Sequence, residues 1–85
     1  MLTTGQQATT TAAVVLPAAS FASGPVTFKA PKANAAAIEI GKSGVTVGTG
    51  FVLDPGDSVT LNIGNLSQVY LIGANTTDKL TWIGA

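Results

Sequence analysis

Two short apolar runs joined by a tight turn decide the fold, in the stretch Phe51-Val52-Leu53-Asp54-Pro55-Gly56-Asp57-Ser58-Val59-Thr60-Leu61. Pro55 presets the first central position of a turn, and Gly56 accepts the positive φ that the second position requires, so the sequence predicts a type II turn over Asp54–Asp57. After the turn, apolar residues recur at every second position, with Val59 and Leu61 pointing to one side. Strand, turn and strand in immediate succession indicate an antiparallel β protein.

The same period of two extends over the rest of the chain from Pro25 onward, with turn residues between the runs. It predicts an all-β fold, a small β-sandwich or jelly-roll-like domain of seven or eight short strands over residues 25–85. Strands are expected at 26–30, 36–41, 45–47, 51–53, 59–63, 69–72 and 79–82, with a hairpin turn at 75–78. The alternation points one set of side chains inward: Val26, Phe28, Ile38, Ile40, Val59, Leu61, Ile63, Leu71, Leu80 and Trp82.

Residues 1–24 differ from the rest because they carry no charge and are rich in Thr, Gln and Ala. We expect an extended N-terminal arm that gains order by strand addition to a neighbouring sheet edge. Its candidate interface residues are Leu2, Val14, Val15, Leu16 and Phe21. The alternative is that 11–16 forms an internal strand of the same sandwich. A cleaved secretory signal is not expected, since residues 1–28 contain no lysine or arginine.

Composition favours a chain that is held in an assembly. Charged residues make up 9% of the 85 residues, against roughly a quarter in ordinary soluble domains, and they balance to zero. Neither cysteine nor histidine is present, so disulfides and thiolate or imidazole metal sites are excluded. A domain this small has a marginal core, and association with a partner would supply the missing stability. The four lysines are dispersed and there is no arginine, which argues against nucleic-acid binding. No apolar run is long enough for a transmembrane helix, so no membrane partner is expected.

Catalytic residues and cofactor sites are not found in the sequence. Asp54 and Asp57 flank one turn, where hydrogen bonding to turn amides explains them better than catalysis or Ca²⁺ binding. Glu39, read as pointing outward, and Asp78 have no partner that the sequence identifies. Trp82 fits core or interface better than a sugar-binding platform, and Tyr70 has the same two readings. We therefore expect a protein that is not an enzyme and binds no cofactor or metal.

Several motifs in order resemble small virion proteins of tailed bacteriophages, of the head-decoration (cement) or head-fibre type. The likeness covers about residues 25–83, and its most specific part is Gly50 to Leu61 followed by Asn65-Leu66-Ser67-Gln68-Val69-Tyr70. The resemblance implies a β-sandwich present in many copies on the capsid exterior of a virion. It also implies a non-catalytic role, in which the protein stabilises the shell by binding neighbouring subunits.

The expected partners are accordingly the major capsid protein or another shell protein, and further copies of the chain in a homo-oligomer such as a trimer. The alternative function is a carbohydrate- or receptor-binding β-module on a virion or bacterial surface. Such a module would expose Trp82 or Tyr70 in a groove. A cupin-like enzyme would share the β architecture but would need metal-binding histidines, which the chain lacks.

Overall fold

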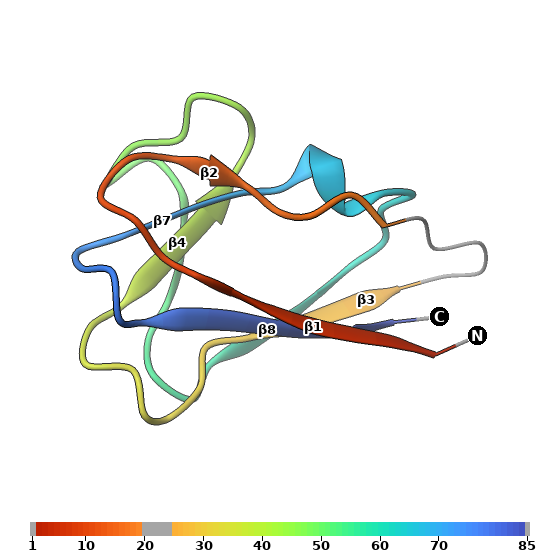
Figure 1. Ribbon diagram of the computed structural model, residues 1–85, viewed down its shortest axis with the longest axis horizontal. Coiled ribbons are helices and arrows are strands. Elements are labelled where there is room, and N and C mark those ends of the chain that lie inside the picture. The colour runs from red at the N-terminus through yellow and green to blue at the C-terminus, as the bar shows by residue number, and fades with distance from the viewer. Residues whose placement is uncertain (1, 20–24, 85) are drawn as a thin grey trace.

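The computed structural model describes residues 2–19 and 25–84, and these form a sandwich of two antiparallel four-stranded sheets (Figure 1). One 3₁₀ turn, η1, precedes the seventh strand. The elements are β1 (Thr3–Ala8), β2 (Val14–Val15), β3 (Val26–Lys29), β4 (Ile38–Gly41), β5 (Phe51–Leu53), β6 (Ser58–Leu61), η1 (Leu66–Gln68), β7 (Tyr70–Gly73) and β8 (Lys79–Gly84). The all-β class predicted from the sequence is confirmed. Within the described ranges, no helix is long and apolar enough to cross a bilayer.

The strand order is that of a rolled ribbon. The first strand pairs with the eighth, the second with the seventh, the third with the sixth and the fourth with the fifth. Rolling this ribbon adds the pairs β3·β8 and β4·β7. The result is sheet A, β1-β8-β3-β6, and sheet B, β2-β7-β4-β5, which is the two-sheet jelly-roll arrangement.

The core lies between the two sheets and is formed by the inward side chains of both. The alternation of β3 and β8 buries Val26 and Phe28 against Leu80 and Trp82, and all four are at most 7% exposed. All ten side chains predicted to point inward are buried or pack against this cluster, so the predicted register is confirmed. The edge strand β6 contributes the ones that are only partly buried: Val59 and Leu61, with Ile63 just beyond its end.

The N-terminal segment is part of the sandwich, which corrects the prediction of an arm over residues 1–24. β1 pairs along its whole length with β8, from Thr3 opposite Gly84 to Ala8 opposite Lys79. Leu16 is 1% exposed, belongs to the core cluster, and follows a strand that pairs with β7. The alternative of an internal strand at 11–16 is confirmed in its placement within the sandwich, although the strand itself spans only Val14–Val15. The physical reason is that the backbone N–H and C=O groups of β1 need hydrogen-bond partners, and the edge of β8 in the same chain supplies them.

The two other differences from the predicted elements concern loops. No strand forms at 45–47, because Gly44 and Gly48 have positive φ (86° and 94°) and the chain turns at both. Val47 is consequently 68% exposed, although Val45 is buried. The segment 75–78 is no hairpin, since β7 and β8 belong to different sheets and this segment crosses between them. The turn at Asp54–Asp57 is confirmed: Gly56 has φ 94°, and the Asp57 amide donates to the Asp54 carbonyl at 2.8 Å.

Candidate interaction surfaces

Two of the four carboxylates are buried and serve the fold. Asp78 is 2% exposed and accepts hydrogen bonds from the Ala35 and Ala36 amides at 2.8 and 3.2 Å and from Asn75 Nδ2 at 3.0 Å. Beside it, Asn34 forms two bonds to the backbone of Lys79, at 2.8 and 2.9 Å. This cluster ties the 34–36 loop to the start of β8, and the three hydrogen bonds to the Asp78 carboxylate explain its burial.

Glu39 lies on the outer side of sheet B, as predicted, but a loop covers it. The Gly48 amide donates to both carboxylate oxygens at 3.0 Å, and the Gly50 amide donates to Oε1 at 3.0 Å. Glu39 is therefore only 8% exposed. A Cβ at Gly50 would come within 2.9 Å of the Glu39 Cβ, so glycine is required for this close approach. Sequence reasoning missed both buried carboxylates because most of their donors are backbone amides of other loops, which carry no signal in the sequence.

The turn carboxylates behave as the sequence predicts. Asp57 Oδ2 accepts a hydrogen bond from the Asp54 amide at 3.1 Å, across the Pro55-Gly56 corner. Asp54, Pro55 and Asp57 are exposed. Among the described residues, no group of three or more acidic, histidine or cysteine side chains is placed to hold a metal ion. The hydrogen bond to the Asp57 carboxylate stabilises the turn.

The candidate interface residues of the N-terminal segment separate into two groups. Leu2 and Val15 are exposed, at 67% and 41%, and are available to a partner. Leu16 is a core residue and is not available, so the interface prediction is corrected for it; Val14 is partly buried against the core, and its interface role stays a prediction. Phe21 lies outside the described residues.

The aromatic candidates also change role. Trp82 is 7% exposed and belongs to the core cluster, with its ring against Gly5. It therefore forms no exposed platform for a sugar ring. Tyr70 is partly buried at the start of β7.

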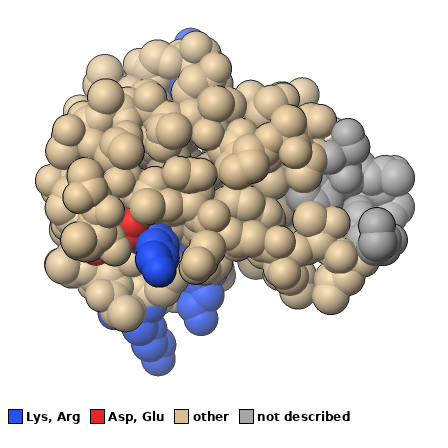
Figure 2. Space-filling view, in the orientation of Figure 1, with Lys and Arg blue, Asp and Glu red and all other residues tan. Residues whose placement is uncertain are grey.

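Exposed apolar side chains form the main surface feature. Phe51 (57%) and Val52 (50%) lie on β5, and Val47 (68%) is on the preceding loop. Ile83 (46%) lies on the outer face of β8. Figure 2 shows a face with few charged side chains, where most of the lysine atoms in view lie toward the lower edge and others appear at the top. None of these four side chains is predicted as an interface residue from the sequence, because alternation alone does not reveal where a sheet ends.

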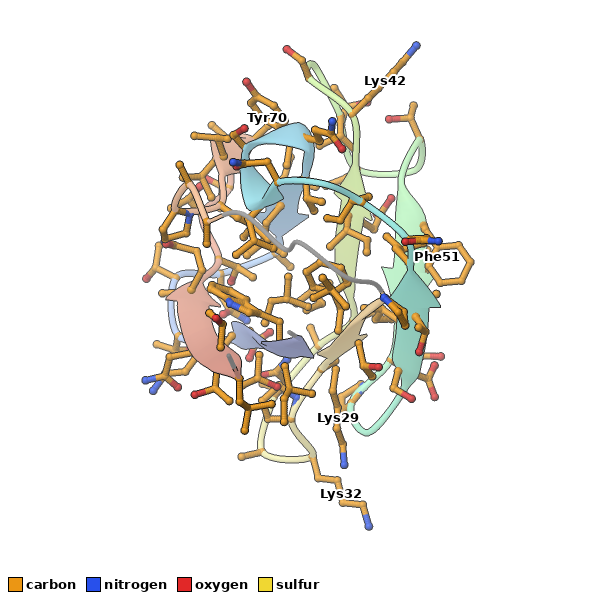
Figure 3. The ribbon with its side chains drawn as sticks, turned by 90° about the vertical axis from the view of Figure 1, so that its right-hand side faces the viewer. Lys29, Lys32, Lys42, Phe51 and Tyr70 are labelled. Atoms are coloured by element: carbon orange, nitrogen blue, oxygen red, sulfur yellow. The ribbon has the colours of Figure 1, made fainter. Side chains whose placement is uncertain are left out.

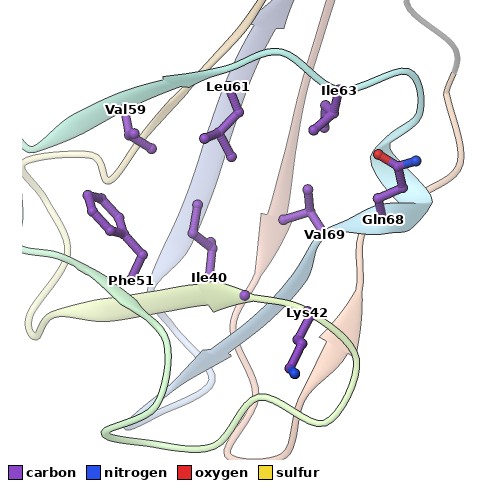
Figure 4. A pocket seen from close by; sticks show the side chains of 9 residues that line it. Ile40, Lys42, Phe51, Val59, Leu61, Ile63, Gln68 and Val69 are labelled. Carbon is purple, nitrogen blue, oxygen red and sulfur yellow. The ribbon is translucent and has the colours of Figure 1, made fainter.

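A groove opens between the end of β4 and the edge strand β6 with the segment that follows it, and Phe51 of the edge strand β5 lies at one end of the groove. Its volume is about 320 Å³. Most of its lining is aliphatic or aromatic, with Lys42 and Gln68 at one end (Figure 4). The lining residues are Ile40, Gly41, Lys42, Phe51, Val59, Leu61, Ile63, Gln68 and Val69.

Comparison of the chain with protein-family models, curated protein sequences and solved structures found no match in any of the three.

Proposed function

We propose that this protein is a non-catalytic structural component of a virion, which decorates and stabilises a bacteriophage capsid by binding neighbouring shell subunits on its exterior. The observation that carries the proposal is the set of large apolar side chains exposed on a nearly uncharged domain. Phe51, Val52 and Val47 are each at least half exposed. A protein that diffuses freely usually keeps a charged surface for solubility, whereas a permanently bound subunit covers such residues with its partner.

The strand order supports the proposal without deciding it. Jelly rolls recur in viral capsid domains, in lectins and in cupins. The cupin class is disfavoured because the chain has no histidine. The lectin class is disfavoured because Trp82, which would stack on a sugar, lies in the core. A structural protein of the viral capsid kind requires no catalytic group, and its binding to shell subunits would cover the exposed apolar side chains.

The test is the copy number of the chain in purified particles. Particles from the source culture are banded on a density gradient, and the chain is quantified by mass spectrometry relative to the major shell protein. We expect a fixed ratio of many copies per particle. Absence from the particles, or a trace amount that varies between preparations, would refute the proposal.

A matched pair of variants tests the surface. Val52→Lys places a charge on the exposed outer side of β5, where its cross-strand neighbour is the acidic Glu39 and no like charge is met, and Thr76→Lys places one on an exposed loop at the 75–78 crossover. Because burying a charge is costly, Val52→Lys should lower incorporation while Thr76→Lys leaves it unchanged. Equal incorporation of both variants would show that the partner binds elsewhere.

A further inference from the structure

The sandwich is incompletely covered on one side, where inner-face residues meet solvent. Phe51 and Leu53 share the inner face of β5, and Phe51 lies opposite the buried Ile40 in the register. Leu53 is 1% exposed, but Phe51 is 57% exposed. Within residues 2–19 and 25–84 the facing sheet ends at β6, so it does not cover the ring, which projects from the side of the sandwich (Figure 3).

The opposite side of the sandwich is closed. The inner face of the edge strand β1 presents Thr3, Gly5 and Gln7, none of which is a large apolar residue. A Cβ at Gly5 would lie 2.6 Å from Cζ2 of Trp82, so the indole ring already fills the space against this strand. The need for an apolar cover is thus concentrated on the side of β5 and β6.

The open edge of β6 also presents free backbone groups. The Ala30 amide donates to the Asp57 carbonyl at 2.9 Å, and Phe28 lies opposite Val59 two residues along. Because hydrogen-bonded and non-hydrogen-bonded pairs alternate in an antiparallel ladder, the N–H and C=O groups of Ser58 and Thr60 point away from β3. The strand Ser58–Leu61 has no charge and no proline, the devices that usually protect an edge.

We propose that this edge is the interface of a homodimer, in which β6 of a second copy pairs antiparallel with β6 across a two-fold axis. An isologous interface needs a surface complementary to itself. Here the protruding Phe51 lies beside an apolar groove of about 320 Å³, so the ring of each copy can enter the groove of the other. The two grooves then form one apolar interior. Sheet A of one copy continues through the paired β6 strands into sheet A of the other.

The charges fit this orientation. β6 carries none, so self-pairing brings no like charges together at the axis. Lys42 lies at the end of the groove away from the Asp54–Asp57 turn (Figure 4). The antiparallel arrangement therefore places Lys42 of each copy toward that turn of the other, where the exposed Asp54 and Asp57 carry two negative charges against the one positive charge of Lys32, which packs over Gly56. It also keeps the two Lys42 ammonium groups at opposite ends of the interface.

The inference goes beyond the proposed function and does not depend on it, because it is tested on the purified chain alone. Sedimentation equilibrium should show a reversible dimer in the wild type. Phe51→Ser should raise the dimer Kd about tenfold or more for each ring lost, hence about a hundredfold for the two rings of a dimer. Val47→Ser, which truncates an exposed valine outside the groove, should leave the Kd unchanged.

The backbone contribution has its own matched pair. Thr60→Pro removes an edge N–H that is not used within the monomer, whereas Thr60→Val keeps this N–H and loses the same hydroxyl contact to Thr27. Circular dichroism should show that both variants fold. We expect Thr60→Pro to weaken the dimer and Thr60→Val to preserve it.

Crosslinking then identifies the edge. The chain has no cysteine, so single Ser58→Cys and Thr60→Cys variants can be joined only through the introduced thiol. A short bismaleimide should crosslink them, while Gln6→Cys on the other edge of sheet A stays monomeric on a denaturing gel. A monomeric wild type, a higher oligomer, crosslinking through Gln6→Cys, or a dimer unaffected by Phe51→Ser would each overturn the inference.

Discussion

Replacing Leu16 by alanine tests whether the N-terminal segment belongs to the folded body. Leu16 is 1% exposed and lies in the core cluster, and its amide donates to the Val69 carbonyl at 3.1 Å. In a solvent-exposed arm, truncation of this side chain would cost almost nothing. Inside the sandwich, it removes buried methyl groups and leaves a cavity.

The expected loss is large compared with the total stability. A fully buried leucine truncated to alanine costs about 2–5 kcal/mol. A two-state domain of 85 residues is stable by about 4–13 kcal/mol. Because about 1 kcal/mol shifts the Tm of a domain this size by roughly 4–8 °C, the variant should melt some 10–30 °C lower.

Urea denaturation followed by circular dichroism and by the fluorescence of Trp82, the sole tryptophan, measures the difference. Val15→Ala is the matched control, because it truncates the neighbouring side chain, which is 41% exposed. The control should change the free energy of unfolding by about 0.5 kcal/mol or less. If Leu16→Ala unfolded at the same urea concentration as Val15→Ala, the segment would not be part of the core, and an arm would again describe it.

Three further predictions concern the body of the sandwich, each read as the free energy of unfolding in urea. Phe28→Ala, at a side chain with no exposure, should cost about 3–5 kcal/mol; parental stability would mean that the register is wrong. Gly56→Val should cost about 1–3 kcal/mol because of the positive φ, while Asp57→Ala should cost no more than about 1.5 kcal/mol; the reverse order would contradict the type II turn. Asp78→Ala should cost about 3 kcal/mol or more because three donors lose their acceptor, and Asp78→Asn, which keeps one acceptor oxygen, should cost less.

From Pro25 onward the periodicity of the sequence predicts every strand that the structure has and the face that each buries, but it also predicts a strand at 45–47 that does not form. Phe28 and Leu61 were placed inward because every second residue of a strand shares a face, and this holds whichever strands become neighbours. Sequence period does not determine pairing, however. β1 reads Thr-Thr-Gly-Gln-Gln-Ala and has no apolar alternation, so its partner β8 could be found only from the rolled topology.

The surface was harder to predict than the core because exposure depends on where the opposite sheet ends. Phe51 and Leu53 have the same parity and an equally apolar character, yet one is largely exposed and the other buried. The buried carboxylates are similar. Glu39 alternates as an outward residue, and only the return of the loop at Gly48 and Gly50 covers it.

The open groove follows from the order of the strands in the two sheets. Rolling a ribbon of eight strands brings both chain ends into sheet A, where β1 covers one side of β8 and β3 the other. On the β1 side the bulk of Trp82 compensates for the small Gly5, and the interior is sealed. On the side of β6 no further strand among the described residues lies beside Val59, and Phe51 is 57% exposed. Small domains bury a small fraction of their surface, so each apolar side chain left exposed costs them a larger share of their stability. The strand order that covers the core on the β1 side leaves it exposed on the β6 side, and a bound partner would cover it there.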